Sequence, residues 1–216
     1  MRLVLAVHGT AAPAGQQVYR DLADRVSAHV PTALAHLDVQ TPLLADVVRA
    51  GDVVVPVLLA RGYHVRVDCA GAGRLGAVVA PAVGPAHPLV GLAQRRLREA
   101  GAGDGWPVVL AAAGSRDPAA RRDLQLAARR LRRLRGTEVE LAFASRAGEV
   151  AATVAAVRER CGGPLAVAGW LLAPGRFAAA AAAAGADVTA APLGVDDAVV
   201  EVVLQRWSSV RRLLAA

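Results

Sequence analysis

Hydrophobic residues occur along this chain in short unbroken runs, separated by longer segments in which they recur every three or four positions. In the first half the apolar runs are 3–7, 33–37 (interrupted only by His36), 53–59 and 77–80. The helix-like segments lie at about 16–30, after Pro42, and at about 88–100. Continuous apolar runs separated by helices are typical of parallel strands buried on both faces. The first half is therefore predicted to be a βαβαβαβα unit with right-handed crossovers.

The second half of the chain repeats the first with weaker similarity. The aligned landmarks, in the same order in both halves, are 7–13 with 112–118, 58–64 with 171–177, Gly84 with Gly194, and Arg96 with Arg206. The Gly-rich segment 101–105 has the composition of a flexible connector. We therefore predict two α/β domains, residues 1–100 and 106–216, each near the usual domain size.

Two histidines follow two apolar runs of the first half. His8 comes directly after the first predicted strand, and His64 comes shortly after the third. Ligands of parallel sheets bind outside the carboxyl ends of the strands, so both imidazoles are expected at one edge of the sheet. The second half has Ala113 and Phe177 at the equivalent positions. Asp38 ends the second strand, where it either adds a carboxylate to this edge or forms a turn or helix cap.

Charge and composition narrow the function classes. The net charge is +7, but all 25 basic residues are Arg, and the chain has no Lys, Ile or Asn, which indicates a GC-rich gene. The densest run, 129–135, lies on a predicted helix whose apolar stripe is Leu124, Ala127, Ala128, Leu131 and Leu134. A solvated basic face is favoured over a phosphate-binding patch. Aromatic residues, at 3%, are too few to stack bases, so no nucleic-acid partner is expected.

Several kinds of site and cellular location are disfavoured because the sequence lacks the residues or patterns that they require. Cys69 and Cys161 are too few for a disulfide framework or a cysteine zinc site. No apolar run approaches the ~20 residues of a membrane span, and no signal-peptide pattern is present, so we expect a cytoplasmic location with no membrane partner. Residues 71–76 match GxGxxG but lack the strand, helix and acidic residue of a dinucleotide site. The absence of Lys excludes a GxxxxGK phosphate loop.

The histidine pair suits a particular group of metals. Two imidazoles, with or without a carboxylate, form an open and borderline-soft site that favours Fe²⁺, Co²⁺, Ni²⁺ or Zn²⁺ over Mg²⁺ or Ca²⁺. The second half lacks these histidines and would instead form a wall of the site. Its candidates for binding anions are Arg116, Arg146 and Arg176.

At these residues the chain resembles the class II chelatases that insert cobalt or iron into sirohydrochlorin. The resemblance is carried by residues 4–10, 55–68, 84–89, 171–177 and 191–194. It implies two Rossmann-like domains with parallel sheets, related by a pseudo-twofold axis across a cleft, with the last helix of each domain packed on its neighbour. It also implies insertion of Co²⁺ or Fe²⁺, with Ni²⁺ as a further candidate, into sirohydrochlorin for sirohaem or cobalamin. No ATP, nucleotide or other cofactor is expected.

The resemblance also implies roles for individual residues. His8 and His64 match the family's two active-site histidines and are expected to bind the metal and take part in catalysis. Asp38 stands where the family commonly has Glu and is a third catalytic candidate. The substrate-binding candidates are Gly9, Thr10, Arg61, Gly62, Arg66, Arg116 and Arg176. A non-catalytic tetrapyrrole or metal carrier is the alternative, and the sequence fits either a monomer with an internal pseudo-dimer or a homodimer.

Overall fold

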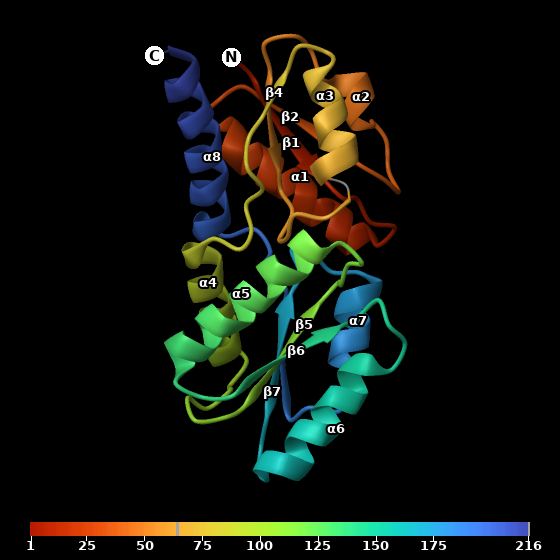
Figure 1. Ribbon diagram of the computed structural model, residues 1–216, viewed down its shortest axis with the longest axis vertical. Coiled ribbons are helices and arrows are strands. Elements are labelled where there is room, and N and C mark those ends of the chain that lie inside the picture. The colour runs from red at the N-terminus through yellow and green to blue at the C-terminus, as the bar shows by residue number, and fades with distance from the viewer. Residues whose placement is uncertain (64, 216) are drawn as a thin grey trace. The chain divides into compact units, whose positions relative to one another are not determined.

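The computed structural model describes residues 1–63 and 65–215, apart from the side chains of residues 66 and 215. The chain forms two compact units, one made of Met1–Gly84 and Val195–Ala216 and the other of Pro85–Gly194. Each unit contains a four-stranded parallel sheet with helices packed against it (Figure 1). The predicted class, two repeated α/β domains with parallel sheets, is confirmed. Within the described part of the chain, none of the helices is long and apolar enough to cross a membrane.

The sheet of the first unit has the strand order β2-β1-β3-β4. Its strands are β1 (Leu3–Val7), β2 (Thr32–His36), β3 (Val53–Pro56) and β4 (Val78–Val79). Its helices are α1 (Pro13–Ser27), α2 (Leu44–Val47), α3 (Ala70–Gly73) and α8 (Asp197–Ala215), with a π-helical turn at Val65–Cys69. Every residue of β1 and β3 is buried, as expected for strands covered on both faces. The third strand pairs over fewer residues than the predicted 53–59, because the chain leaves the sheet after Val57 donates to the carbonyl of Ala6.

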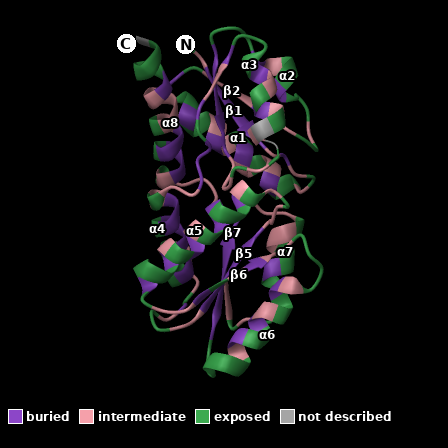
Figure 2. Ribbon diagram, in the orientation of Figure 1, coloured by how far each residue is buried: buried purple, intermediate pink, exposed green. Residues whose placement is uncertain are grey.

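The sheet of the second unit has the equivalent order, β6-β5-β7-β8. Its strands are β5 (Val108–Ala112), β6 (Val139–Phe143), β7 (Ala166–Trp170) and β8 (Val188–Ala190). Its helices are α4 (His87–Glu99), α5 (Pro118–Arg135), α6 (Glu149–Cys161) and α7 (Arg176–Ala182). Aliphatic side chains fill the space between helices and sheet, so the buried faces of the helices point inward (Figure 2).

The first and last residues of helix α5 are determined by capping residues in the sequence. Asp117 caps the start, accepting a hydrogen bond from the backbone of Ala119 at 2.8 Å, and Gly136, at φ +70°, ends the helix in the left-handed region. Its arginines lie mostly on the exposed face. Two residues depart from the predicted stripe. Leu134 is 55% exposed, whereas Arg135 is buried and donates to Gln94 Oε1 at 2.8 Å.

The last helix of each half packs on the other half's sheet. Helix α4 contacts β7 and β8, and helix α8 contacts β3 and α1. Two matching arginines fasten these helices: Arg96 donates to the carbonyl of Leu193, and Arg206 donates to the carbonyl of Ala82, both at 3.1 Å. The family resemblance implied this packing. The compact units therefore differ from the ranges 1–100 and 106–216, which follow the order of the repeat along the chain.

The strand registers reproduce the internal repeat. In the first sheet Leu3 pairs with Val53, and in the second Val108 pairs with Ala166. These registers make Ala113 of the second sheet equivalent to His8 of the first, in agreement with the sequence alignment.

Candidate active site

The first unit brings two of the predicted residues together at the carboxyl edge of its sheet. His8 directly follows β1, and Asp38 follows β2 by two residues. Pairing continues beyond the strands, because Leu37 donates to the carbonyl of Val7 at 2.9 Å and Asp38 donates to the carbonyl of His8 at 3.0 Å. His8 and Asp38 therefore lie side by side at the ends of the adjacent strands β1 and β2, as the strand pattern predicts.

The His8 side chain is half-buried at this edge. Its Nδ1 lies 3.4 Å from the carbonyl oxygen of Gly9, a distance at which a protonated Nδ1 donates to that oxygen. A proton on Nδ1 leaves the lone pair on Nε2, and the partner of one ring nitrogen commonly decides which nitrogen binds a metal. His64, the expected second ligand, lies outside the described residues. Within those residues, no three His, Cys, Asp or Glu side chains group closely enough to hold a metal ion.

The Asp38 carboxylate takes part in a local turn. The side chain is exposed, and its Oδ1 accepts a hydrogen bond from the backbone of Val39 at 2.7 Å. Val39 has φ +67°, in the left-handed region that β-branched residues rarely adopt. Asp38 therefore takes part in a turn and also lies at the same edge of the sheet as His8.

Gly9 and Thr10 form the loop that carries His8. Gly9 has φ +95°, and a Cβ at this position would lie 2.3 Å from the backbone oxygen of Asp38, so only glycine permits this approach of the two loops. Thr10 donates its backbone N–H to Gln40 Oε1 at 2.9 Å, and its carbonyl accepts from Gln16 Nε2 at 3.1 Å. Gln40 carries no signal in the sequence, since a polar residue in a predicted loop has no periodicity that would mark it.

The predicted arginines lie in both units. Arg61 is exposed and, with Gly62, belongs to the segment that continues β3 beyond the same edge as His8. The side chain of Arg66 lies outside the description. In the second unit, Arg116 is exposed in the loop after β5, and Arg176 is the exposed first residue of α7.

Two arginines of the second unit stack on neighbouring rings. The guanidinium of Arg176 lies 4.9 Å from the centroid of the Phe177 ring. Arg146 lies at the same distance from the Phe143 ring and also pairs with Glu149 at 3.0 Å. Because a carboxylate already neutralises Arg146, Arg176 is the better candidate of the two for binding an anion.

The second unit preserves the backbone of this edge without its histidine. Ser145 donates to the carbonyl of Ala113 at 3.0 Å, as Asp38 does to that of His8. Gly114 has φ +95°, the same value as Gly9. The second unit is therefore a structural repeat in which alanine stands at the position of His8.

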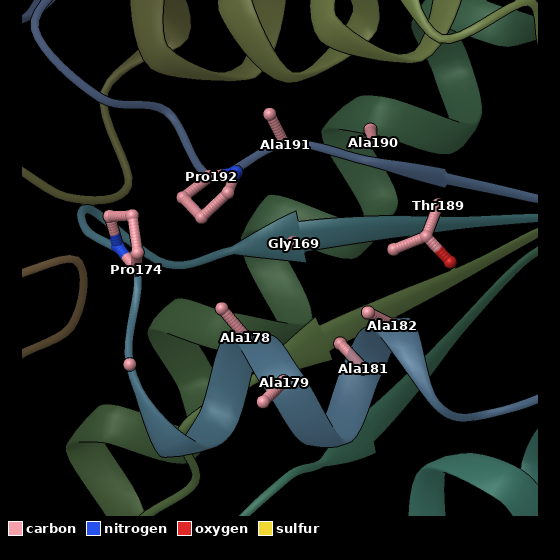
Figure 3. Close-up of a pocket in the computed structure, with 11 residues that line it drawn as sticks. Gly169, Pro174, Ala178, Ala179, Ala181, Ala182, Thr189, Ala190, Ala191 and Pro192 are labelled. Atoms are coloured by element: carbon pink, nitrogen blue, oxygen red, sulfur yellow. The ribbon is translucent and has the colours of Figure 1, made fainter. Parts of the chain in front are cut away.

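A pocket of about 370 Å³ lies at the carboxyl ends of β7 and β8 in the second unit (Figure 3). Its lining is Gly169, Pro174, Gly175, Ala178, Ala179, Ala181, Ala182, Thr189, Ala190, Ala191 and Pro192. Figure 3 shows the methyl groups of Ala178 and Ala182 on the α7 side, facing the strands. The pocket exists because these short side chains leave the space between helix and sheet unfilled, and its surface is mainly apolar.

Fold and site together define a class of protein: two α/β repeats with parallel sheets, of which only the first carries a histidine at the end of its first strand. The CbiX family model matches residues 2–100 and 107–210, and the chain belongs to the CbiX family. The family predicted from the sequence is confirmed. No curated protein matches the sequence significantly.

Solved structures share the fold. SirB from Bacillus subtilis with Fe³⁺ superposes with a TM-score of 0.75 at 20% identity, over 96% of this chain and 94% of that one. The sirohydrochlorin chelatase SirB from Bacillus subtilis subspecies spizizenii, in complex with cobalt, gives 0.72 at 21% identity, over 95% and 92%. A multi-domain protein from Deinococcus radiodurans with structural similarity to chelatases gives 0.60 at 21% identity, over 95% of this chain and 54% of that one.

Proposed function

We propose that this protein is a sirohydrochlorin chelatase, which inserts Co²⁺ or Fe²⁺ into the tetrapyrrole as an ATP-independent enzyme. Membership of the CbiX family and the fold shared with SirB support the reaction class. The observation that carries the proposal is the position of His8 at the carboxyl edge of the first sheet. There its backbone carbonyl accepts a hydrogen bond from Asp38, which follows the neighbouring strand β2.

The chemistry of insertion fits these side chains. The entering metal must lose water, and two pyrrole nitrogens must lose protons. Imidazole, with an ordinary pKa of about 6.5, can bind a metal and accept a proton near neutral pH. In the proposed mechanism Nε2 of His8, together with His64, receives the metal, and one of these histidines or Asp38 accepts a pyrrole proton.

The arginines fit the charge of the substrate. Sirohydrochlorin carries carboxylates around its rim, and a guanidinium binds a carboxylate through paired hydrogen bonds. We assign this role to Arg61 and Arg66 in the first unit and to Arg116 and Arg176 in the second. We also assign Gly9, Thr10 and Gly62 to the substrate-binding surface.

An anaerobic absorbance assay tests this proposal. Sirohydrochlorin is mixed with a small amount of protein and with Co²⁺, Fe²⁺ or Ni²⁺ in turn, and the change of its spectrum is followed. Many turnovers per protein molecule are expected for an enzyme, whereas a change that stops at one equivalent would show a carrier instead. The rates with the three ions identify the preferred metal.

Substitution of the histidines tests their roles. We expect His8→Ala and His64→Ala to abolish insertion while leaving sirohydrochlorin binding largely intact, because the arginines that hold its carboxylates are unchanged. Binding is measured by titration of tetrapyrrole absorbance without metal. Retained turnover in either variant would remove that histidine from the mechanism.

A further inference from the structure

The loop after β2 contains a strained turn at Asp38, Val39 and Gln40. The backbone N–H of Gln40 donates to the carbonyl of Asp38 at 2.7 Å, and Val39 between them has φ +67°. A hydrogen bond across three residues around a positive φ defines the rare and strained form of the γ-turn. Such strain persists only where surrounding interactions fix the conformation, and it is concentrated at functional sites.

Interactions on both sides hold the turn in place. Before it, Asp38 donates its backbone N–H to the carbonyl of His8 at 3.0 Å. After it, the carbonyl of Pro42 accepts the backbone N–H of His36 at 3.0 Å, and the His36 ring nitrogen Nδ1 lies 3.3 Å from the same oxygen. The His36 side chain is buried, so this end of the loop is anchored in the core.

Gln40 joins the turn to the loop that carries His8. Its Oε1 accepts the backbone N–H of Thr10 at 2.9 Å, while the Thr10 carbonyl accepts Nε2 of Gln16 from helix α1 at 3.1 Å. Thr10 is thus held on both backbone groups, two residues after His8. The oxygen of Asp38 fits against Gly9 so closely that a Cβ there would be 2.3 Å away.

We propose that Gln40 is a positioning residue for metal insertion and acts through Thr10. Its side-chain oxygen fixes the backbone of residues 8–10 against the strained turn. This keeps the position of the His8 imidazole relative to the Asp38 carboxylate constant. The inference rests on the proposed function. The role belongs to the acceptor oxygen of the side chain, so a carboxylate of the same length can replace the amide.

The test compares three substitutions at residue 40 with one control. Gln40→Ala removes the acceptor, Gln40→Asn withdraws it by one methylene, and Gln40→Glu keeps it at the same reach. Gln17→Ala is the matched control, because Gln17 is an exposed glutamine of the same helix as Gln16 and bonds to Arg20 and Asp21.

Steady-state kinetics per folded molecule should separate positioning from stability. A misplacement of about 1 Å in a catalytic group can cost roughly 100-fold in rate. We expect Gln40→Ala and Gln40→Asn to lower kcat between about 10-fold and 100-fold, with the KM for sirohydrochlorin within about twofold of the wild type. Gln40→Glu should keep at least about a third of the wild-type kcat, since its carboxylate accepts the same hydrogen bond. The control should match the wild type.

A second readout keeps this inference separate from the proposed function. The affinity for Co²⁺ alone, measured by titration of its visible absorbance, should fall about tenfold in Gln40→Asn and recover in Gln40→Glu. If the wild type binds Co²⁺ but does not turn over sirohydrochlorin, the proposed function fails while this comparison still tests Gln40.

Two results would overturn the positioning role. One is a kcat and Co²⁺ affinity of Gln40→Ala equal to those of the control. The other is a Gln40→Glu variant as impaired as Gln40→Asn although both are folded by circular dichroism. If Gln40→Ala does not fold, the Asn and Glu variants decide the question, because both keep a polar side chain.

Discussion

Replacing Gly9 with alanine should disrupt the site through the backbone alone. Gly9 has φ +95°, and a Cβ added there would meet the Asp38 oxygen at 2.3 Å, the Asp38 carbonyl carbon at 3.4 Å and Val39 Cβ at 3.5 Å. The repeat provides a matched control. Gly114 also has φ +95°, but the atoms nearest to its added Cβ belong to side chains. They are the Ser145 hydroxyl oxygen at 2.7 Å, which a side-chain rotation can move away, and Phe143 Cβ and Cγ at 3.0 and 3.2 Å, which need to give by only a few tenths of an ångström.

The two substitutions share one energetic cost and differ in another. Alanine in a left-handed conformation costs about 1–2 kcal/mol at either position. At residue 9 the backbone oxygen must also move by about 1 Å to reach ordinary contact, and overpacking of this kind adds roughly 1–3 kcal/mol. We therefore expect Gly9→Ala to lower the free energy of unfolding by about 2–5 kcal/mol and Gly114→Ala by about 1–2 kcal/mol.

Urea unfolding and metal-insertion assays on both variants would check this expectation. Because the displaced oxygen belongs to Asp38, the residue beside His8, Gly9→Ala should also lose about 100-fold in turnover. Gly114→Ala should remain active, since its unit has alanine at the position of His8. Equal losses of stability and turnover in the two variants would refute the reasoning, because the backbone contact would then contribute nothing.

Three further expectations concern buried ionisable groups. Asp52 pairs with Arg2 at 2.6 Å; burial acts to raise the pKa of this carboxyl, but hydrogen bonds from Arg2 and the Arg49 backbone outweigh it and lower the pKa below its ordinary 3.8. The pair thus stabilises the fold above pH 3.8, and this stabilisation is lost as pH falls through the depressed pKa. Asp52→Asn should therefore reduce the loss of unfolding free energy in acid, measured by urea unfolding at several pH values. An unchanged loss would contradict this. Burial raises the pKa of the Cys69 thiol to about 12. In a Cys161→Ser background, which removes the exposed second cysteine, a thiol reagent at pH 8 should therefore label Cys69 only after unfolding, and rapid labelling of this native variant would be the contrary result. Burial also raises the pKa of Tyr19 to about 12, so its phenolate absorbance, followed in a Tyr63→Phe background, should develop near pH 12 and not near pH 10.

The strands were predictable because burial on both faces leaves a direct record in the sequence. The run at 3–7 coincides with β1, and the runs at 33–37 and 77–80 lie within one or two residues of β2 and β4. The edge at which His8 and Asp38 meet follows from parallel pairing alone. Helix limits also carry signals, since proline lies in the first turns of α1, α4 and α5.

Other features depend on contacts that periodicity does not encode. The hydrogen bond between Thr10 and Gln40 joins residues 30 positions apart and requires the strained turn at Val39, which no local sequence signal predicts. The π-helical turn at Val65–Cys69 lies in a segment that the sequence predicts only as a connection between two strands. An apolar stripe shows that a helix packs on a sheet but not on which one, so the positions of α4 and α8 came from the family resemblance alone.

The exchange of final helices makes the two halves of the chain dependent on each other. A cut within the connector 101–105 would leave each fragment without the helix that covers its own sheet, because α4 packs on β7 and β8 while α8 packs on β3. The fragments should therefore be recoverable only as a complementing pair.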